Sequence, residues 1–212
     1  MRPYEKDPAA IYAQSFATVR KEARLYRFPE GMDVMVTRLI HACGMVEIAD
    51  RLAFSPEAYA AGRAAIAGGA PILCDCEMVG AGVIRRALPA ENEVVVTLND
   101  ARVPAMAKEM GTTRSAAAVE LWRPQLEGAI VAIGNAPTAL FHLLEVLESG
   151  AQKPAVILGF PVGFVGAAES KAELADNPRA TEFVALRGRR GGSAMASAAV
   201  NALAAGLGGG TL

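Results

Sequence analysis

The sequence contains few of the residues that most often carry protein chemistry. Cysteine occurs three times, at Cys43, Cys74 and Cys76, and histidine occurs twice. A low, odd cysteine count without an apolar export signal argues against a disulfide framework and predicts a reducing, cytoplasmic compartment. No run approaches the roughly 20 apolar residues of a membrane span, so a membrane partner is not expected.

Neither sign of charge is in excess. The 212 residues carry 21 basic and 22 acidic side chains, a net charge of −1. No global field therefore steers the chain onto nucleic acid or an anionic membrane. Hydrophobic residues make up 52% and charged residues 20%, which is typical of a globular chain with a full core. Any anion site must come from a local cluster.

The two parts of the chain differ in pattern. Residues 1–70 predict helices, over 7–24, 33–50 and 55–69, the first of them starting from Asp7-Pro8. Residues 71–205 alternate short apolar runs with helical segments, which predicts a parallel sheet covered on both faces. The expected strands are 72–74, 94–98, 129–133, 156–160 and 183–186. We predict one α/β domain over 1–212, a flavodoxin-like, doubly wound, five-stranded parallel sheet with an N-terminal helical extension.

The carboxyl ends of these strands collect glycine, small polar residues and arginine. The segments are 75–80, 99–102, 134–138, 159–164 and 187–193. Ligands of doubly wound sheets bind beyond the carboxyl ends of the strands. The topology therefore predicts a ligand site at this edge, without specifying its chemistry.

The two histidines are the candidates for proton transfer near neutral pH. His142 lies among leucines of an expected helix and is interpreted as structural or exposed. His41 lies off the apolar stripe of its helix, with Arg38 three residues before it. The pattern alone leaves open whether His41 is functional or a surface or interface residue.

Other polar clusters have two interpretations each. Cys74-Asp75-Cys76 predicts no metal site, because alternate strand residues point to opposite faces and no histidine completes the ligand set. The segment 187–193 places three arginines in a glycine-rich turn before a helix that Ser193 is expected to cap. It suits a carboxylate or phosphate, or is a solvated loop. Arg114, at another helix start, contacts an anion or belongs to a structural cap.

Several segments together resemble the precorrin-8X methylmutase family. They are RLIHACG (38–44), CDCEMVGAG (74–82), TTRSAAAVELW (112–122), GNAPTAL (134–140), GFPVGFVGAAESK (159–171) and RGRRGGS (187–193). The resemblance implies a flavodoxin-like homodimer with its site near the subunit interface. It implies a 1,5-sigmatropic shift of a methyl group from carbon 11 to carbon 12 of precorrin-8X, giving hydrogenobyrinic acid without a cofactor. A related branch acts on the cobalt-containing substrate.

The resemblance also assigns roles to residues. The family's catalytic histidine falls on His41, and its ligand contacts fall near Ser15, Arg114 and the glycine-rich loops. A concerted methyl shift needs no nucleophile or metal, but protonation of a ring nitrogen assists it, and imidazolium is the natural donor. The substrate's carboxylates favour the charged imidazole. Further substrate contacts are expected from residues that wall a cleft or bind carboxylates: Arg38, Met78, Val79, Phe160, Val162, Arg189 and Arg190.

Two other functions stay open at this point. A flavin or nucleotide binder would use 187–193 as a phosphate cradle, although the segment lacks the end of a Walker motif. A non-catalytic tetrapyrrole carrier would bind the same ligand as the enzyme without turning it over.

Overall fold

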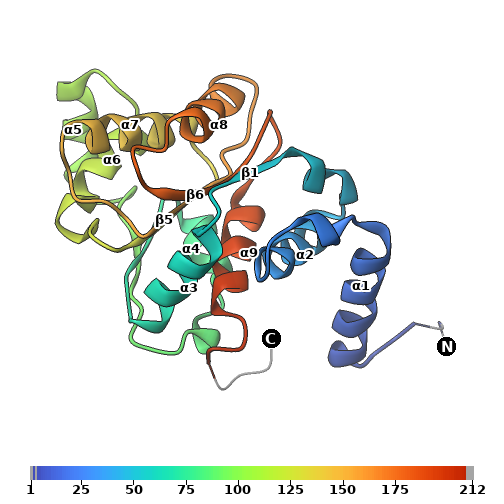
Figure 1. The fold of residues 1–212 in the computed structure, drawn as a ribbon. Helices are drawn as coiled ribbons and strands as arrows, with labels where there is room; N and C mark the ends of the chain where they lie inside the picture. The colour runs from blue at the N-terminus through green and yellow to red at the C-terminus, as the bar shows by residue number, and fades with distance from the viewer. Residues whose placement is uncertain (1, 3, 209–212) are drawn as a thin grey trace.

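The computed structural model describes residue 2 and residues 4–208. The predicted domain, 1–212, also includes residues 1, 3 and 209–212, which lie outside the described residues. A central sheet is flanked by helices on both faces, and helix α1 (Pro8–Glu22) lies at the side of the molecule away from α5–α8 (Figure 1). Among the described residues, no helix is both long and apolar enough to cross a membrane.

The sheet has six strands in the order β1-β6-β5-β4-β2-β3. All neighbouring pairs are parallel except β1 with β6. The parallel strands confirm the five apolar runs: β2 (Ile72–Cys74), β3 (Val94–Val96), β4 (Ile130–Ile133), β5 (Val156–Gly159) and β6 (Glu182–Leu186).

The predicted number of five strands is wrong. Strand β1 (Leu52–Phe54) lies in residues 1–70, which were expected to be helical, and pairs antiparallel with β6, placing Leu52 opposite Leu186. Three residues are too few to show a period of two, so the pattern carries no signal for this edge strand. The strand forms because it pairs with β6, which lies more than a hundred residues away in the chain.

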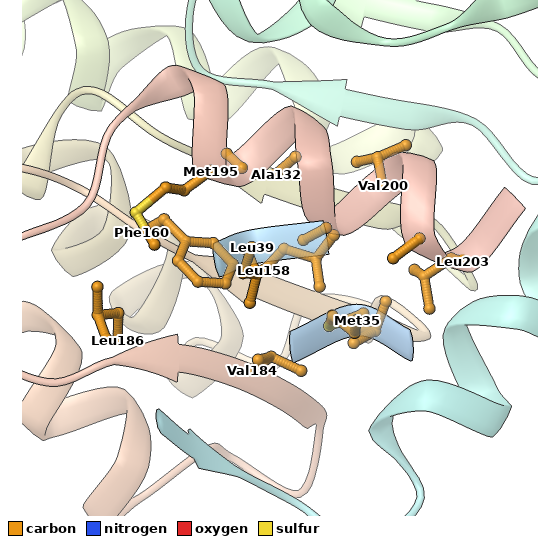
Figure 2. Close-up of a cluster of buried hydrophobic side chains, with 14 of the residues drawn as sticks. Met35, Leu39, Ala132, Leu158, Phe160, Val184, Leu186, Met195, Val200 and Leu203 are labelled. Atoms are coloured by element: carbon orange, nitrogen blue, oxygen red, sulfur yellow. The ribbon is translucent and has the colours of Figure 1, made fainter. Parts of the chain in front are cut away.

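One face of the sheet packs against α2 (Met32–Cys43), α3 (Ala58–Ala67), α4 (Glu77–Gly82) and α9 (Ser193–Ala204). In Figure 2, Leu158 and Val184 of the strands lie among Met35, Leu39 and Val200 of α2 and α9. Because strand side chains alternate, neighbouring residues such as Ile157 enter a second core on the other face.

That second face carries α6 (Arg114–Val119), α7 (Pro137–Glu148) and α8 (Ala167–Asp176), with α5 (Val103–Met110) packed on α6. Short 3-10 helices complete the described chain: η1 (Leu25–Arg27), η2 (Val46–Arg51), η3 (Arg85–Ala87) and η4 (Glu120–Gln125). The sheet is thus covered on both sides, as its continuous apolar strands predict.

Helices α1 and α2 set the position of the candidate site. The Asp7 side chain accepts a hydrogen bond from Ala9 N at 3.0 Å, and Pro8 occupies the first turn, as predicted. The expected helix over 33–50 is wrong in its second half, because Gly44 adopts a left-handed φ of 70° and ends α2 at Cys43. The chain continues as η2.

Candidate active site around His41

The imidazole of His41 is held by helix α1. Its Nδ1 lies 2.7 Å from Oγ of Ser15, and its ring centroid lies 5.3 Å from the rings of both Tyr12 and Phe16. These three residues share one face of α1, at spacings of three and four. His41 is exposed, and its Nε2 has no hydrogen-bond partner among the described residues. One ring nitrogen is therefore oriented and the other is available to a ligand.

Two hollows border the His41 ring, and another adjoins one of them. One of about 420 Å³ is lined by Ser15, His41 and the facing sides of α1 and α2. A second, of about 570 Å³, lies between α1 and the segment Ile84–Arg86. A third, of about 170 Å³, joins His41 to the first turns of α9 at Ala194 and Ser197. His41 therefore faces space that leads toward the carboxyl edge of the sheet.

Arg38 lies one turn before His41 on α2. Its guanidinium carbon is 5.4 Å from the centre of the Phe16 ring, and its buried Nε has no hydrogen-bond partner. Burial lowers the pKa of Arg38, because the guanidinium loses water without gaining a carboxylate. A cation in this state favours an incoming anion.

The predicted ligand edge is built by two loops that lie side by side. Gly192 N donates to the Phe160 carbonyl at 2.8 Å, and Gly163 N donates to the Arg189 carbonyl at 3.1 Å. A Cβ at Gly191 would lie 2.2 Å from the Phe160 carbonyl oxygen, so a side chain does not fit there. The structure thus brings 159–164 and 187–193 together, as the topology predicts.

The arginines of the second loop already have partners. Arg190 Nη1 lies 2.6 Å from Oε1 of Glu47, which ties the loop to η2, directly after α2. This hydrogen bond lowers the pKa of Glu47. Arg189 lies over the Phe164 ring at 5.3 Å, and Arg187 Nη2 lies 3.6 Å from Asp176. Ser193 does not cap α9: Gly192 occupies the cap, and Ser193 Oγ contacts Cys76 Sγ at 3.5 Å.

Asp75 has a structural role that its motif did not reveal. Its buried carboxylate accepts hydrogen bonds from the backbone N–H groups of Gly134, Asn135 and Ala136 at 2.9, 2.9 and 2.8 Å. Burial raises the pKa of Asp75, while these three donors oppose the rise. The carboxylate builds the turn before α7. Within residue 2 and residues 4–208, no group of three or more His, Cys, Asp or Glu could hold a metal ion.

Two predicted substrate contacts are corrected by the structure. Val79 and Phe160 are both fully buried, so neither side chain can wall an open cleft. Phe160 lies among Leu39, Leu158 and Met195 in the core (Figure 2). Both residues follow strand ends, but the packing of α9 over this edge turns their side chains inward.

The other predicted residues are distributed over the molecule. Met78 and Val162 are exposed. Arg114 begins α6 on the other face of the sheet, and its neighbour Thr113 hydrogen-bonds Thr138 of α7 at 2.8 Å. Sequence reasoning missed the aromatic pair Tyr12 and Phe16, whose spacing of four on one helix face was the available signal.

An α/β fold that presents an oriented imidazole beside a guanidinium without a carboxylate partner, in open hollows, has the arrangement of a candidate acid–base site for an anionic ligand. The chain belongs to the precorrin-8X methylmutase family, because the family model of that description matches residues 10–205. It is therefore an isomerase of cobalamin biosynthesis that moves a methyl group within one molecule.

Three relatives illustrate the match. The precorrin-8X methylmutase of Pseudomonas aeruginosa is 63% identical over 96% of this chain and 98% of its own. The cobalt-precorrin-8 methylmutase of Priestia megaterium is 36% identical over 95% of this chain and 89% of its own. The solved structure of precorrin-8X methyl mutase from Thermus thermophilus has a TM-score of 0.83 and 40% identity, covering 92% of this chain and 94% of that one.

Proposed function

We propose that this chain catalyses the 1,5-sigmatropic shift of a methyl group from carbon 11 to carbon 12 of precorrin-8X, giving hydrogenobyrinic acid. The observation that carries the proposal is the exposed His41 ring, oriented through Nδ1 by Ser15 and open at Nε2. An imidazolium at this position donates a proton or hydrogen bond to a ring nitrogen. The conjugated system then becomes electron-poor at the carbon that receives the methyl group.

This chemistry agrees with the residues around His41. The methyl group leaves one carbon and joins another of the same molecule, so the step needs neither a nucleophile nor a cofactor. The enzyme must hold a flat ring in place and stabilise its charge, and such positioning contributes much of a rate enhancement. Contacts are proposed from the predicted residues that keep exposed or half-buried side chains: Ser15, Arg38, Met78, Arg114, Val162, Arg189 and Arg190.

The metal-free substrate is favoured over its cobalt-containing counterpart. The P. aeruginosa relative named for precorrin-8X shares far more of this sequence than the P. megaterium relative named for cobalt-precorrin-8. Since both match nearly the whole chain, the difference in identity does not reflect coverage. Cobalt-precorrin-8 is the second substrate to be tried.

The proposal includes a homodimer in the cytoplasm, with a flavodoxin-like core made of the five parallel strands. Their order, β3-β2-β4-β5-β6, corresponds to 2-1-3-4-5 in chain order. Ile11 of α1 is exposed beside the hollow at His41, and the proposed second subunit packs against this part of the helix. Sedimentation of the purified protein tests this assembly.

Anaerobic incubation with precorrin-8X, followed by visible spectroscopy, tests the activity. Wild-type protein should convert excess substrate to hydrogenobyrinic acid. His41→Ala should lose a factor of about 10² to 10⁴ in rate, as expected for a general acid, and still bind the product. His142→Ala is the matched control and should turn over normally.

Three results would oppose the proposal. A spectral change limited to one equivalent, without isomerised product on extraction, identifies a carrier. Turnover of cobalt-precorrin-8 and not of precorrin-8X shows that the cobalt-containing compound is the natural substrate. Tight binding of free flavin mononucleotide or ATP instead of a corrinoid indicates a nucleotide-binding protein.

A further inference from the structure

The hollow between α1 and the segment Ile84–Arg86 combines an apolar surface with positive charge. Its volume is about 570 Å³, and Tyr12, Phe16 and Ile84 provide apolar walls. Arg20, Arg38 and Arg86 also line it. Tyr12, Arg38 and Ile84 border the smaller hollow at His41 as well, so the two spaces adjoin. A ligand lying against these aromatic rings would therefore reach the imidazole.

The three guanidinium groups of this hollow lack a counter-charge. None of them makes a hydrogen bond or ion pair with residue 2 or with residues 4–208, and no described Asp or Glu lines the hollow. By contrast, Arg24 and Arg27, near the end of α1, both bind Asp50 at 3.0 Å. Nearby arginines outside the hollow thus have a carboxylate partner, and the arginines that line the hollow do not.

Two of these cations share one aromatic ring. The guanidinium carbons of Arg20 and Arg38 lie 6.0 and 5.4 Å from the centre of Phe16. Two positive charges therefore lie beside one ring without a counter-charge, and Arg38 also keeps a buried Nε without an acceptor. Carboxylate oxygens would relieve both conditions, because guanidinium groups bind carboxylates through paired, charge-assisted hydrogen bonds.

We propose that this hollow binds the macrocycle of the substrate, and that Arg20 and Arg86, together with Arg38, hold its peripheral carboxylates. The identity of the ring rests on the proposed function. The chemical class, a flat apolar ring bearing several carboxylates, follows from the aromatic walls and the three unpaired guanidinium groups. Arg20 and Arg86 then bind the substrate without taking part in the methyl shift. The loop 187–193 is a weaker carboxylate site, since Arg187 and Arg190 already bind acidic side chains.

The experiment compares two double variants with the same loss of charge. Arg20→Gln with Arg86→Gln removes two arginines of the hollow. Arg24→Gln with Arg85→Gln removes two nearby arginines that do not line it; Arg85 lines another hollow beside Glu77. All four side chains are exposed, so both variants should fold. Hydrogenobyrinic acid is titrated into each protein at low and high salt, and turnover of precorrin-8X is measured separately.

We expect the hollow variant, Arg20→Gln with Arg86→Gln, to bind the product about 100-fold more weakly than wild type, because each lost charge-assisted contact costs roughly tenfold in affinity. Its affinity should also depend less on salt. Its KM should rise while kcat changes little, and the control should behave as wild type. Unchanged affinity in the hollow variant, or an equal loss in the control, overturns the proposal. If wild type binds the corrinoid through these arginines but never isomerises it, the proposed activity fails and the binding site stands. If wild type turns over and the hollow variant matches it, the binding site fails and the activity stands.

Discussion

Ser15 and His41 lie 26 residues apart on different helices, yet Ser15 Oγ contacts the Nδ1 of His41 at 2.7 Å. The contact occupies one ring nitrogen and leaves Nε2 for the substrate. Helix α1 has little else to hold it, since Val19 is its one buried residue among those described. The orientation of the imidazole therefore depends directly on how α1 packs against α2.

Replacing Ser15 should test this dependence. Ser15→Ala removes the bond to Nδ1 and should lower kcat by about 3- to 10-fold, the equivalent of one ordinary hydrogen bond, with little change in KM. Thr18→Ala is the control, since Thr18 lines the same hollow but bonds to the Gln14 carbonyl. Failure of Ser15→Thr to restore the rate would contradict an orienting role.

His142 should show the opposite behaviour to His41. Its Nδ1 lies 3.0 Å from Glu145 and its Nε2 lies 2.6 Å from Glu120, which links α7 to η4 on the face of the sheet away from His41. His142→Phe should reduce the free energy of unfolding by about 1–2 kcal/mol and leave turnover unchanged. His41→Ala should lower turnover and cost less stability than His142→Phe, because the His41 ring is exposed. Urea unfolding and steady-state rates on both variants check the pattern; a slow His142→Phe enzyme would contradict it.

Lys171 should make stability depend on pH in the alkaline range. The side chain is fully buried, donates to the Arg190 carbonyl at 2.5 Å, and burial lowers its pKa to about 8. In the unfolded chain the value is about 10.4, so between these two pH values the unfolded state holds the proton that the folded state has released. The free energy of unfolding contributed by this group therefore rises with pH across that window.

Lys171→Met removes the titrating group and supplies the reference. Urea midpoints measured from about pH 7 to pH 10.5 should rise for wild type relative to the variant between pH 8 and about 10.4. Other lysines, tyrosines and cysteines titrate in both proteins and cancel in the difference. Parallel curves for the two proteins would show that Lys171 keeps its proton in the folded state.

Gly191 should not tolerate even a methyl group. A Cβ there would meet the carbonyl oxygens of Phe160 and Pro161 at 2.2 and 2.6 Å, so Gly191→Ala must separate the two loops at the carboxyl edge. We expect a loss of about 1–3 kcal/mol of stability together with reduced turnover. Gly68→Ala, whose added Cβ meets carbonyl oxygens at 3.4 and 3.6 Å, should stay within about 0.5 kcal/mol of wild type. Thermal unfolding that ranks the two variants equally would count against this close packing.

The sequence by itself determined the elements whose signals are local. Continuous apolar runs predicted all five parallel strands, and Asp7-Pro8 predicted the start of α1, because burial on two faces and helix capping depend on neighbouring residues. It also predicted a ligand site at the carboxyl ends of the strands, which stays a prediction. The helix patterns predicted a structural or exposed His142 and left the role of His41 open, and the motif resemblance then assigned the catalytic role to His41.

Only the tertiary structure decided which side chains meet. Pairing with β6 creates β1, and the cover of α9 turns Val79 and Phe160 into the core. The packing of α1 on α2 brings Ser15 to His41, and it leaves Arg20 without a carboxylate while Arg24, one turn later, binds Asp50. Each outcome depends on residues far apart in the chain. The direction of a side chain and its charge partner depend on residues that are distant in the sequence and close in the fold. A local sequence pattern therefore cannot predict them.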